Sequence, residues 1–68
     1  MEEIRDCTGK LVCIADEALG LIQHKSSKEQ ITAVMPVGGV ILFKTKETST
    51  EIQLREGPYF LVNSIRNK

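Results

Sequence analysis

The sequence predicts a small all-β domain, and two observations support this prediction. Turn-forming residues recur about every eight to twelve residues along the 68-residue chain, a spacing typical of small all-β domains. Between the turns lie three unbroken apolar runs, Leu11 to Ala15, Val40 to Phe43 and Tyr59 to Val62. We expect a single domain over residues 1–68, built as an antiparallel meander or a partly closed barrel of about six or seven short strands.

In the first half of the chain, turn formers divide the sequence into four expected strands. Thr8-Gly9 is expected to form a tight turn, Gly20 suits a turn because glycine accepts a positive φ, and a polar loop spans Ser26 to Glu29. Pro36 stops the last of these strands because proline cannot donate a ladder hydrogen bond. The expected strands are Ile4 to Asp6, Lys10 to Ala15, Leu21 to Lys25 and Gln30 to Met35.

The second half contains three further expected strands. Gly38-Gly39 allows a tight reversal into the second apolar run, and a loop follows at Glu47 to Thr50. Ile52 and Leu54 alternate with polar residues, as in a half-exposed strand, and Gly57-Pro58 turns the chain into the last strand. The expected strands are Val40 to Lys46, Glu51 to Glu56 and Tyr59 to Ser64.

One segment has an alternative structure. A helix over residues 10–25 would make the fold α+β, and it would carry on one face the apolar residues Leu11, Ala15, Ala18 and Ile22. Two features favour a β-hairpin. The Val-Cys-Ile core of the first apolar run prefers a pleated surface, and Gly20 would cost about 1 kcal/mol inside a helix.

The apolar runs also predict self-association. A strand in a small antiparallel sheet normally alternates between apolar and polar residues, so an unbroken run indicates cover on both faces. A chain of 68 residues buries only about 60% of its unfolded surface and cannot cover three such strands by itself. We expect the second cover to be another copy of the chain, in a homodimer or a larger symmetric oligomer.

Composition excludes several classes of protein. Nine basic residues balance nine acidic ones, so bulk charge gives no reason to expect nucleic acid or an anionic membrane. No window approaches the about 18 apolar residues of a membrane span, so we expect a soluble protein. A tight turn at Thr8-Gly9 would place Cys7 opposite Lys10 and Cys13 opposite Ile4. The two sulfurs are then not cross-strand partners, and we expect free thiols.

The N-terminal two thirds of the chain carries a resemblance. Its residues are Ile4-Arg5-Asp6, Gly9 to Cys13, Asp16-Glu17, Gly20, Ile22 and Lys25. Over residues 3–46 this pattern resembles short proteins encoded by phages and integrated mobile elements of Gram-positive bacteria, in which it forms a small β-meander and from which no function carries over. The chain departs from them in its longer polar loop at Ser26 to Gln30 and in its C-terminal strands. The resemblance implies a mobile-element product in a bacterial cytoplasm.

The sequence contains no catalytic constellation, metal set or cofactor motif. His24 is the only histidine, and its polar neighbours place it at a solvent-facing strand end. A nucleophilic pair of Cys13 and His24 would need an accessible thiol, whereas the apolar flanks of Cys13 indicate burial. Asp16-Glu17 belongs to a turn, and two cysteines with one histidine do not supply the four ligands of structural zinc. We expect no enzyme activity, no cofactor and no metal.

We therefore expect a non-catalytic binding protein that acts as an oligomer. Lys44 and Lys46 project from the same face of one expected strand, and Arg55 lies in the same mildly basic half. Tyr59 is the best candidate for stacking, so these four residues form the expected partner surface. The expected partner is a host or phage protein, which the chain would bind as an inhibitor of a defence system. The alternatives are nucleic acid on the basic strand, and a small ligand or nucleotide at the oligomer interface.

Overall fold

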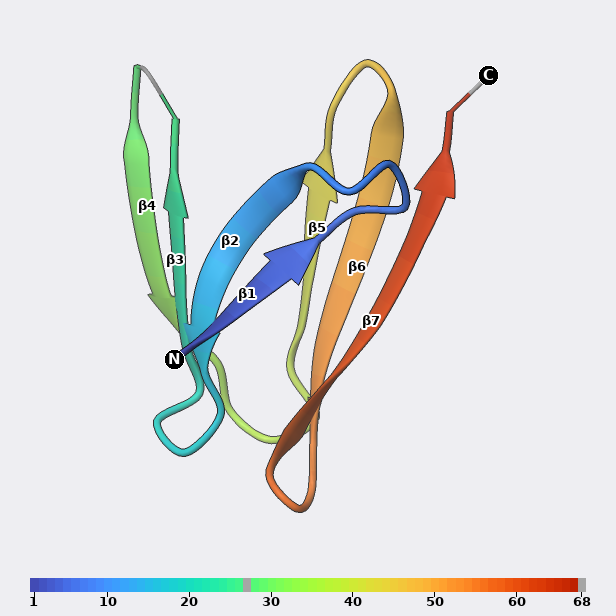
Figure 1. Cartoon of the computed structure of the whole chain (residues 1–68). Coiled ribbons are helices and arrows are strands. Elements are labelled where there is room, and N and C mark those ends of the chain that lie inside the picture. The colour runs from blue at the N-terminus through green and yellow to red at the C-terminus, as the bar shows by residue number, and fades with distance from the viewer. Residues whose placement is uncertain (27, 68) are drawn as a thin grey trace.

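The protein folds as two antiparallel sheets. The computed structural model describes residues 1–26 and 28–67, and the described chain contains seven strands and no helix. The strands are β1 (Glu2–Arg5), β2 (Leu11–Asp16), β3 (Leu21–Lys25), β4 (Gln30–Val34), β5 (Val40–Lys44), β6 (Thr48–Arg55) and β7 (Tyr59–Arg66). The first sheet has the order β1-β2-β3-β4 and the second the order β5-β6-β7, so the strands form no closed barrel (Figure 1). The all-β prediction is confirmed, and the alternative helix over residues 10–25 is wrong because β2 and β3 occupy them.

The strand boundaries differ from the prediction at β1, which spans Glu2–Arg5 instead of Ile4 to Asp6, and around the β5–β6 turn. The expected strand Val40 to Lys46 ends at Lys44, and β6 begins at Thr48. The Thr45 hydroxyl causes this difference. It accepts hydrogen bonds from the backbone N–H of Glu47 at 3.2 Å and of Thr48 at 3.0 Å, which closes a tight turn. In the predicted loop at residues 26–29, Ser27 lies outside the described residues.

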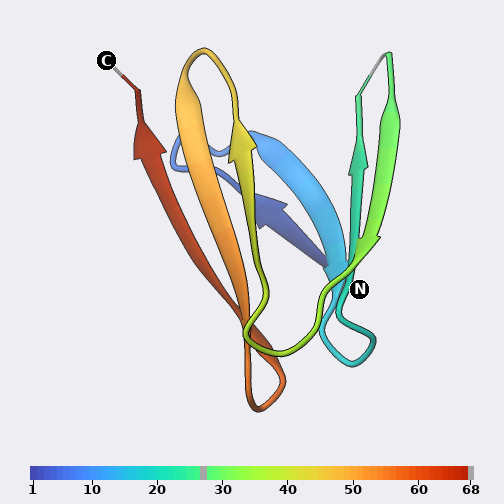
Figure 2. The ribbon, with the colours of Figure 1, turned by 180° about the vertical axis from the view of Figure 1, so that it is seen from behind.

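The two sheets meet at the end of the molecule where the β4–β5 connection passes between them, and they diverge toward the other end (Figures 1 and 2). Two backbone hydrogen bonds hold this junction: Met35 N–H donates to the Gly20 carbonyl, and Gly38 N–H donates to the Leu54 carbonyl, both at 2.7 Å. Gly20 has φ +66°, and a Cβ there would lie 2.4 Å from the Met35 carbonyl oxygen. The junction therefore requires glycine at position 20.

A small apolar cluster lies between the sheets. Its buried members are Ile4, Cys13, Ala15, Ile22, Met35, Ile52 and Leu54. The predicted pairing of Ile4 opposite Cys13 is confirmed by the β1–β2 register. Near the diverging end, the His24 ring of the first sheet contacts the Phe43 ring of the second, with a centroid distance of 5.1 Å. The core is thus built from both sheets, although few side chains are fully buried.

The Asp6 carboxylate connects the β1–β2 turn to the second sheet. Its Oδ1 accepts hydrogen bonds from Thr8 Oγ1 at 2.6 Å, from Thr8 N–H at 2.9 Å and from Lys10 N–H at 3.0 Å. Its Oδ2 accepts a hydrogen bond from Thr48 Oγ1 on β6 at 3.1 Å. The backbone N–H of Asp6 donates to the Lys10 carbonyl, so the predicted pairing of Cys7 with Lys10 is wrong. Cys7 N–H instead donates to Ser64 Oγ on β7 at 3.0 Å.

Within one chain, the first two apolar runs are covered on one face only. In the second run Val40 and Leu42 are 55% and 59% exposed, whereas Ile41 and Phe43 pack against the core. In the first run Cys13 and Ala15 are buried, whereas Ile14, which lies between them, is exposed. Alternation of side chains across a strand produces this pattern. The expected cover on the second face is thus absent from the described part of the chain, and self-association stays a prediction.

We predict that acid weakens the fold through Asp6. The hydrogen bond from the Thr8 hydroxyl, followed by those from Lys10 and Thr8 N–H and from Thr48, holds the pKa of Asp6 at about 2, below its ordinary value of 3.8. Because the folded-state pKa is lowered, the stabilisation is complete above about pH 4 and is lost as pH falls through about 2. Thermal denaturation across this range should therefore show a smaller acid loss in Asp6→Asn than in the parent.

Thr48→Val provides the control for the Asp6 prediction. It removes one donor to Asp6 Oδ2 while keeping the carboxylate, so it should give an acid profile between those of the parent and Asp6→Asn. An Asp6→Asn profile identical to that of the parent would contradict the role given to this carboxylate.

We also predict that the two cysteines differ in their effect on stability. Cys7 is exposed, Cys13 is buried, and both are free. Cys13→Ser should reduce the free energy of unfolding by about 1 to 3 kcal/mol because it buries a hydroxyl, whereas Cys7→Ser should change it little. Denaturant titration measures both variants, and reductant should leave the melting temperature of the parent unchanged. Equal losses in the two variants would contradict the prediction.

Candidate binding surfaces

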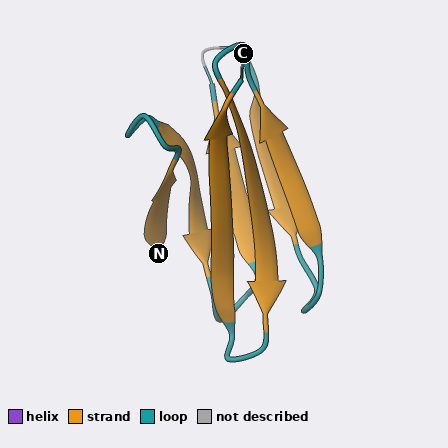
Figure 3. Ribbon diagram, turned by 90° about the vertical axis from the view of Figure 1, so that its right-hand side faces the viewer, coloured by secondary structure: helices purple, strands orange, loops and turns teal. Residues whose placement is uncertain are grey.

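The side of the second sheet that points away from the core is rich in exposed apolar side chains. We call it the outer face, and its members are Val40, Leu42 and Lys44 of β5, Ser49, Glu51, Gln53 and Arg55 of β6, and Tyr59, Leu61, Asn63 and Ile65 of β7. Its five large hydrophobic or aromatic residues are between 45% and 59% exposed. Side chains that alternate with them, such as Ile52 and Leu54, are buried in the core. In Figure 3, β7, which ends at the C-terminus, and β6 lie side by side on the near side of the molecule, and no described strand passes in front of them.

The strand register arranges the outer face in rows. Val40, Gln53 and Leu61 form one row, Leu42, Glu51 and Asn63 the next, and Arg55 with Tyr59 lies at the end near the sheet junction. On the outer face, apolar side chains therefore concentrate on the two edge strands β5 and β7, while the outer side chains of the central strand β6 are polar. The two charges of opposite sign on β6, Glu51 and Arg55, lie on either side of Gln53.

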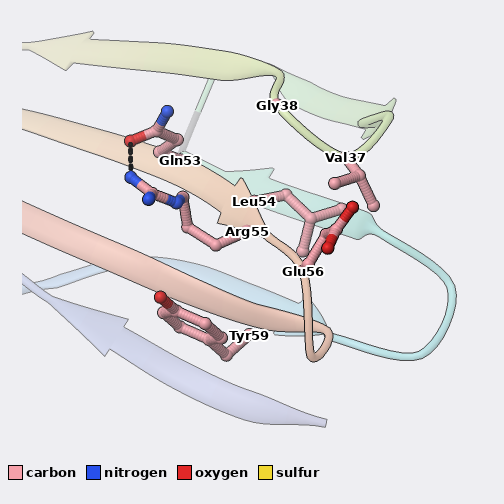
Figure 4. A pocket seen from close by; sticks show the side chains of 7 residues that line it. All are labelled: Val37, Gly38, Gln53, Leu54, Arg55, Glu56 and Tyr59. Carbon is pink, nitrogen blue, oxygen red and sulfur yellow. Dashed lines mark hydrogen bonds between the residues drawn. The ribbon is translucent and has the colours of Figure 1, made fainter.

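A hollow of about 280 Å³ lies at the junction end of the outer face (Figure 4). Its lining is Val37, Gly38, Gln53, Leu54, Arg55, Glu56 and Tyr59. Arg55 extends back along β6, and its Nη1 donates a hydrogen bond to Gln53 Oε1 at 3.5 Å (Figure 4). A Cβ at Gly38 would have no atom within 4 Å, so this side of the hollow is open to solvent.

Charge is separated along the molecule despite the balanced composition. The diverging end, with the β1–β2, β3–β4 and β5–β6 loops and the end of β7, is called here the basic end (Figure 1). Its described charged residues are Arg5, Lys10, Lys25, Lys28, Lys44, Lys46 and Arg66 against Glu3, which forms a salt bridge with Arg5, and Asp6, Glu29 and Glu47. Seven cations against four anions leave a formal excess of three positive charges among these described residues.

The opposite end, at the sheet junction, is acidic. Its described charged side chains are Glu2, Asp16, Glu17 and Glu56 against Arg55, a formal excess of three negative charges. Burial, and then the neighbouring Glu17 carboxylate, raise the pKa of Glu2 above its ordinary value. Burial is the larger of the two causes, and the Glu17 carboxylate adds to it.

The structure divides the four residues of the expected partner surface between the two ends. Lys44 pairs with Ser49 in the β5–β6 register, and Arg55 pairs with Tyr59 in the β6–β7 register. The two pairs are separated by the length of β6 from Ser49 to Arg55, about 20 Å at about 3.3 Å per residue. Lys46 lies in the β5–β6 turn, so its predicted place beside Lys44 on one strand is wrong. All four side chains are exposed.

The groups weighed for catalysis have structural surroundings. His24 is half-buried, and its Nδ1 lies 2.6 Å from the Val12 carbonyl oxygen, so its predicted place at a solvent-facing strand end is wrong. The error arose because His24 points to the core side of β3, against Phe43. Burial raises the pKa of the Cys13 thiol to about 11, which keeps it protonated near neutral pH. The described residues contain no group of three or more side chains arranged to hold a metal ion.

Sequence reasoning missed most of the outer face. It placed Val40, Leu42 and Leu61 inside two-sided apolar strands, and it gave no role to Glu51 or Ile65. A period of two within each run was the signal that could have separated outer from inner side chains.

No helix in the described chain is both long and apolar enough to cross a membrane. Comparison of the chain with protein-family models, with curated proteins and with solved structures gives no match.

Proposed function

We propose that the protein is a non-catalytic binding protein of phage or mobile-element type that acts as a homo-oligomer on a host or phage protein, as an inhibitor of a defence system. The separation of charge along the molecule carries this proposal. A basic end with an excess of three positive charges fits an acidic patch on a partner, although the whole chain is formally neutral. The resemblance of residues 3–46 to mobile-element proteins supports the setting, a bacterial cytoplasm.

The loops at the basic end are held by hydrogen bonds, which supports a preformed contact surface. Asn67 Nδ2 donates to the Thr45 carbonyl and Asn67 N–H donates to the Glu47 carbonyl, both at 2.8 Å. Ser49 Oγ donates to Asn67 Oδ1 at 2.8 Å. These bonds fix the β5–β6 turn, which carries Lys46, against the end of β7. A surface that is already ordered pays less conformational entropy when it binds.

The surroundings of the basic residues favour a protein partner over nucleic acid. Lys46 and Arg66 share a hollow of about 400 Å³ with Thr8, Glu47 and Asn67. The Glu47 carboxylate in this hollow would repel a nucleic-acid phosphate, whereas a mixed protein surface can place a cation opposite it. The stacking candidate Tyr59 is at the other end of the outer face, far from these cations. Single-stranded nucleic-acid sites combine cations and aromatic residues in one groove.

We predict that reversing the charge of Lys44 and Lys46 weakens partner binding. The double variant Lys44→Glu/Lys46→Glu should keep the fold, since both side chains are exposed, and should bind the partner at least about fivefold more weakly, or about 1 kcal/mol. The partner is recovered by pull-down from the native host, purified and titrated by calorimetry. The variant Lys44→Arg/Lys46→Arg, which keeps both charges, is the matched control and should bind as the parent does.

Three outcomes would redirect the proposal. Equal binding by the Glu and Arg double variants would remove Lys44 and Lys46 from the contact surface. Salt-sensitive retention of the parent on DNA or heparin, lost in the Glu variant, would assign the basic end to nucleic acid. A nucleotide released by heat from the purified protein would instead support sequestration of a small ligand.

A further inference from the structure

We infer that the outer face binds the same face of a second copy about a two-fold axis that crosses the strands at Gln53. The inference rests on the homo-oligomer of the proposed function and specifies its interface. Three independent features of the face carry it: the positions of its charges, the hollow at its junction end, and the distribution of its apolar side chains.

The charges on β6 select the direction of the axis. Two copies of a sheet can stack with the two-fold axis either along the strands or across them. An axis along the strands places Glu51 over Glu51 of the second copy and Arg55 over its Arg55, which is repulsive at both positions. An axis across the strands makes the stacked strands antiparallel and avoids both repulsions when it is centred on Gln53.

The same charges select the register. With the axis at Gln53, Arg55 lies over Glu51 of the second copy, and the symmetry repeats this pairing of opposite charges. With the axis at Glu51, the two Glu51 carboxylates lie over each other. With the axis midway between Gln53 and Glu51, Arg55 lies over Ser49 of the second copy and has no anion. Arg55 already extends along the face toward Gln53, where its Nη1 donates to Oε1 at 3.5 Å (Figure 4).

The hollow supports the same register. Val40 pairs with Gln53 and Leu42 with Glu51, and before Val40 the Gly38 N–H donates to the Leu54 carbonyl, so Gly38 lies beside the end of β6. Rotation about the axis at Gln53 therefore places Leu42 of each copy at the level of Arg55 of the other, over the hollow that Arg55 and Gly38 line. Leu42 is 59% exposed, and Gly38 lines the hollow of about 280 Å³ with open space where a Cβ would be. The apolar side chain thus enters the hollow.

The remaining rows also match. Val40 lies over Val40 and Leu61 over Leu61 of the second copy, and Tyr59 lies over Asn63, whose amide can hydrogen-bond the phenol. The overlap spans about five residues on each of the strands, roughly 14 by 17 Å. This is small beside permanent dimers, so the dimer should dissociate on dilution. Lys44 lies beyond the overlap, which leaves the two basic ends exposed at opposite ends of the dimer.

The test uses two charge reversals, Arg55→Glu and Glu51→Arg. Each variant alone places like charges over each other twice, so its self-association constant should fall at least about tenfold. An equal mixture restores both pairings, because one chain then carries two anions and the other two cations. Sedimentation velocity across a concentration series should therefore show dimer in the parent, monomer in each variant and a heterodimer in the mixture.

Two further variants complete the test. Leu42→Ala should weaken the parent dimer at least about fivefold by emptying the hollow. Lys44→Glu, on the same face but outside the overlap, should leave dimerisation unchanged. Circular dichroism confirms that every variant is folded.

The outcomes separate this interface from the proposed function. A parent that stays monomeric at every concentration, or an Arg55→Glu variant that dimerises like the parent, would overturn the interface. Failure of the mixture to form heterodimer while both single variants are monomeric would overturn the Gln53 register. None of these results would alter the effect of Lys44→Glu/Lys46→Glu on partner binding, which tests the basic end by itself.

Discussion

The placement of the β1–β2 turn against the second sheet depends on the Asp6 carboxylate. Beyond the sheet junction the sheets diverge, and at the far end they are joined by the contact between His24 and Phe43 and by polar contacts from this turn. One oxygen of Asp6 organises the β1–β2 turn, and the other accepts the buried Thr48 hydroxyl of β6. Because the acceptor of each of these hydrogen bonds is a charged carboxylate, the bonds are stronger than hydrogen bonds between neutral groups. They hold the turn in a region where few apolar side chains are buried.

This polar contact places the two candidate surfaces. It carries Lys10 and the β1–β2 turn to the side of the β5–β6 turn, which gathers cations from distant parts of the sequence into the basic end. In the same turn, Cys7 N–H donates to Ser64 Oγ on the inner side of β7, and the hydroxyls of Ser64 and Thr50 lie 2.9 Å apart. No described residue covers the opposite side of β6 and β7 in this way, so the outer face stays available for another molecule.

The outer face and the basic end complement each other in the proposed function. A dimer that covers Val40, Leu42 and Leu61 removes apolar surface from water, which is the main driving force for association. The two-fold axis places the basic ends of the two copies at opposite ends of the dimer. The dimer can therefore bind a partner with two acidic sites, or two copies of one partner. Two linked contacts increase the overall affinity without any new contact.

The sequence by itself determined the all-β class, most strand positions and the turns, because glycine, proline and alternation of side chains act over a few neighbouring residues. It also determined that Lys44, Lys46, Arg55 and Tyr59 are exposed. Only the tertiary structure decided that His24 lies on the core side of β3 and that Asp6 accepts a hydrogen bond from Thr48. It also decided that the four exposed residues are divided between the two ends of the second sheet. These features depend on how one sheet is placed against the other, and that placement is set by contacts between residues as far apart as Asp6 and Thr48, which no local pattern records.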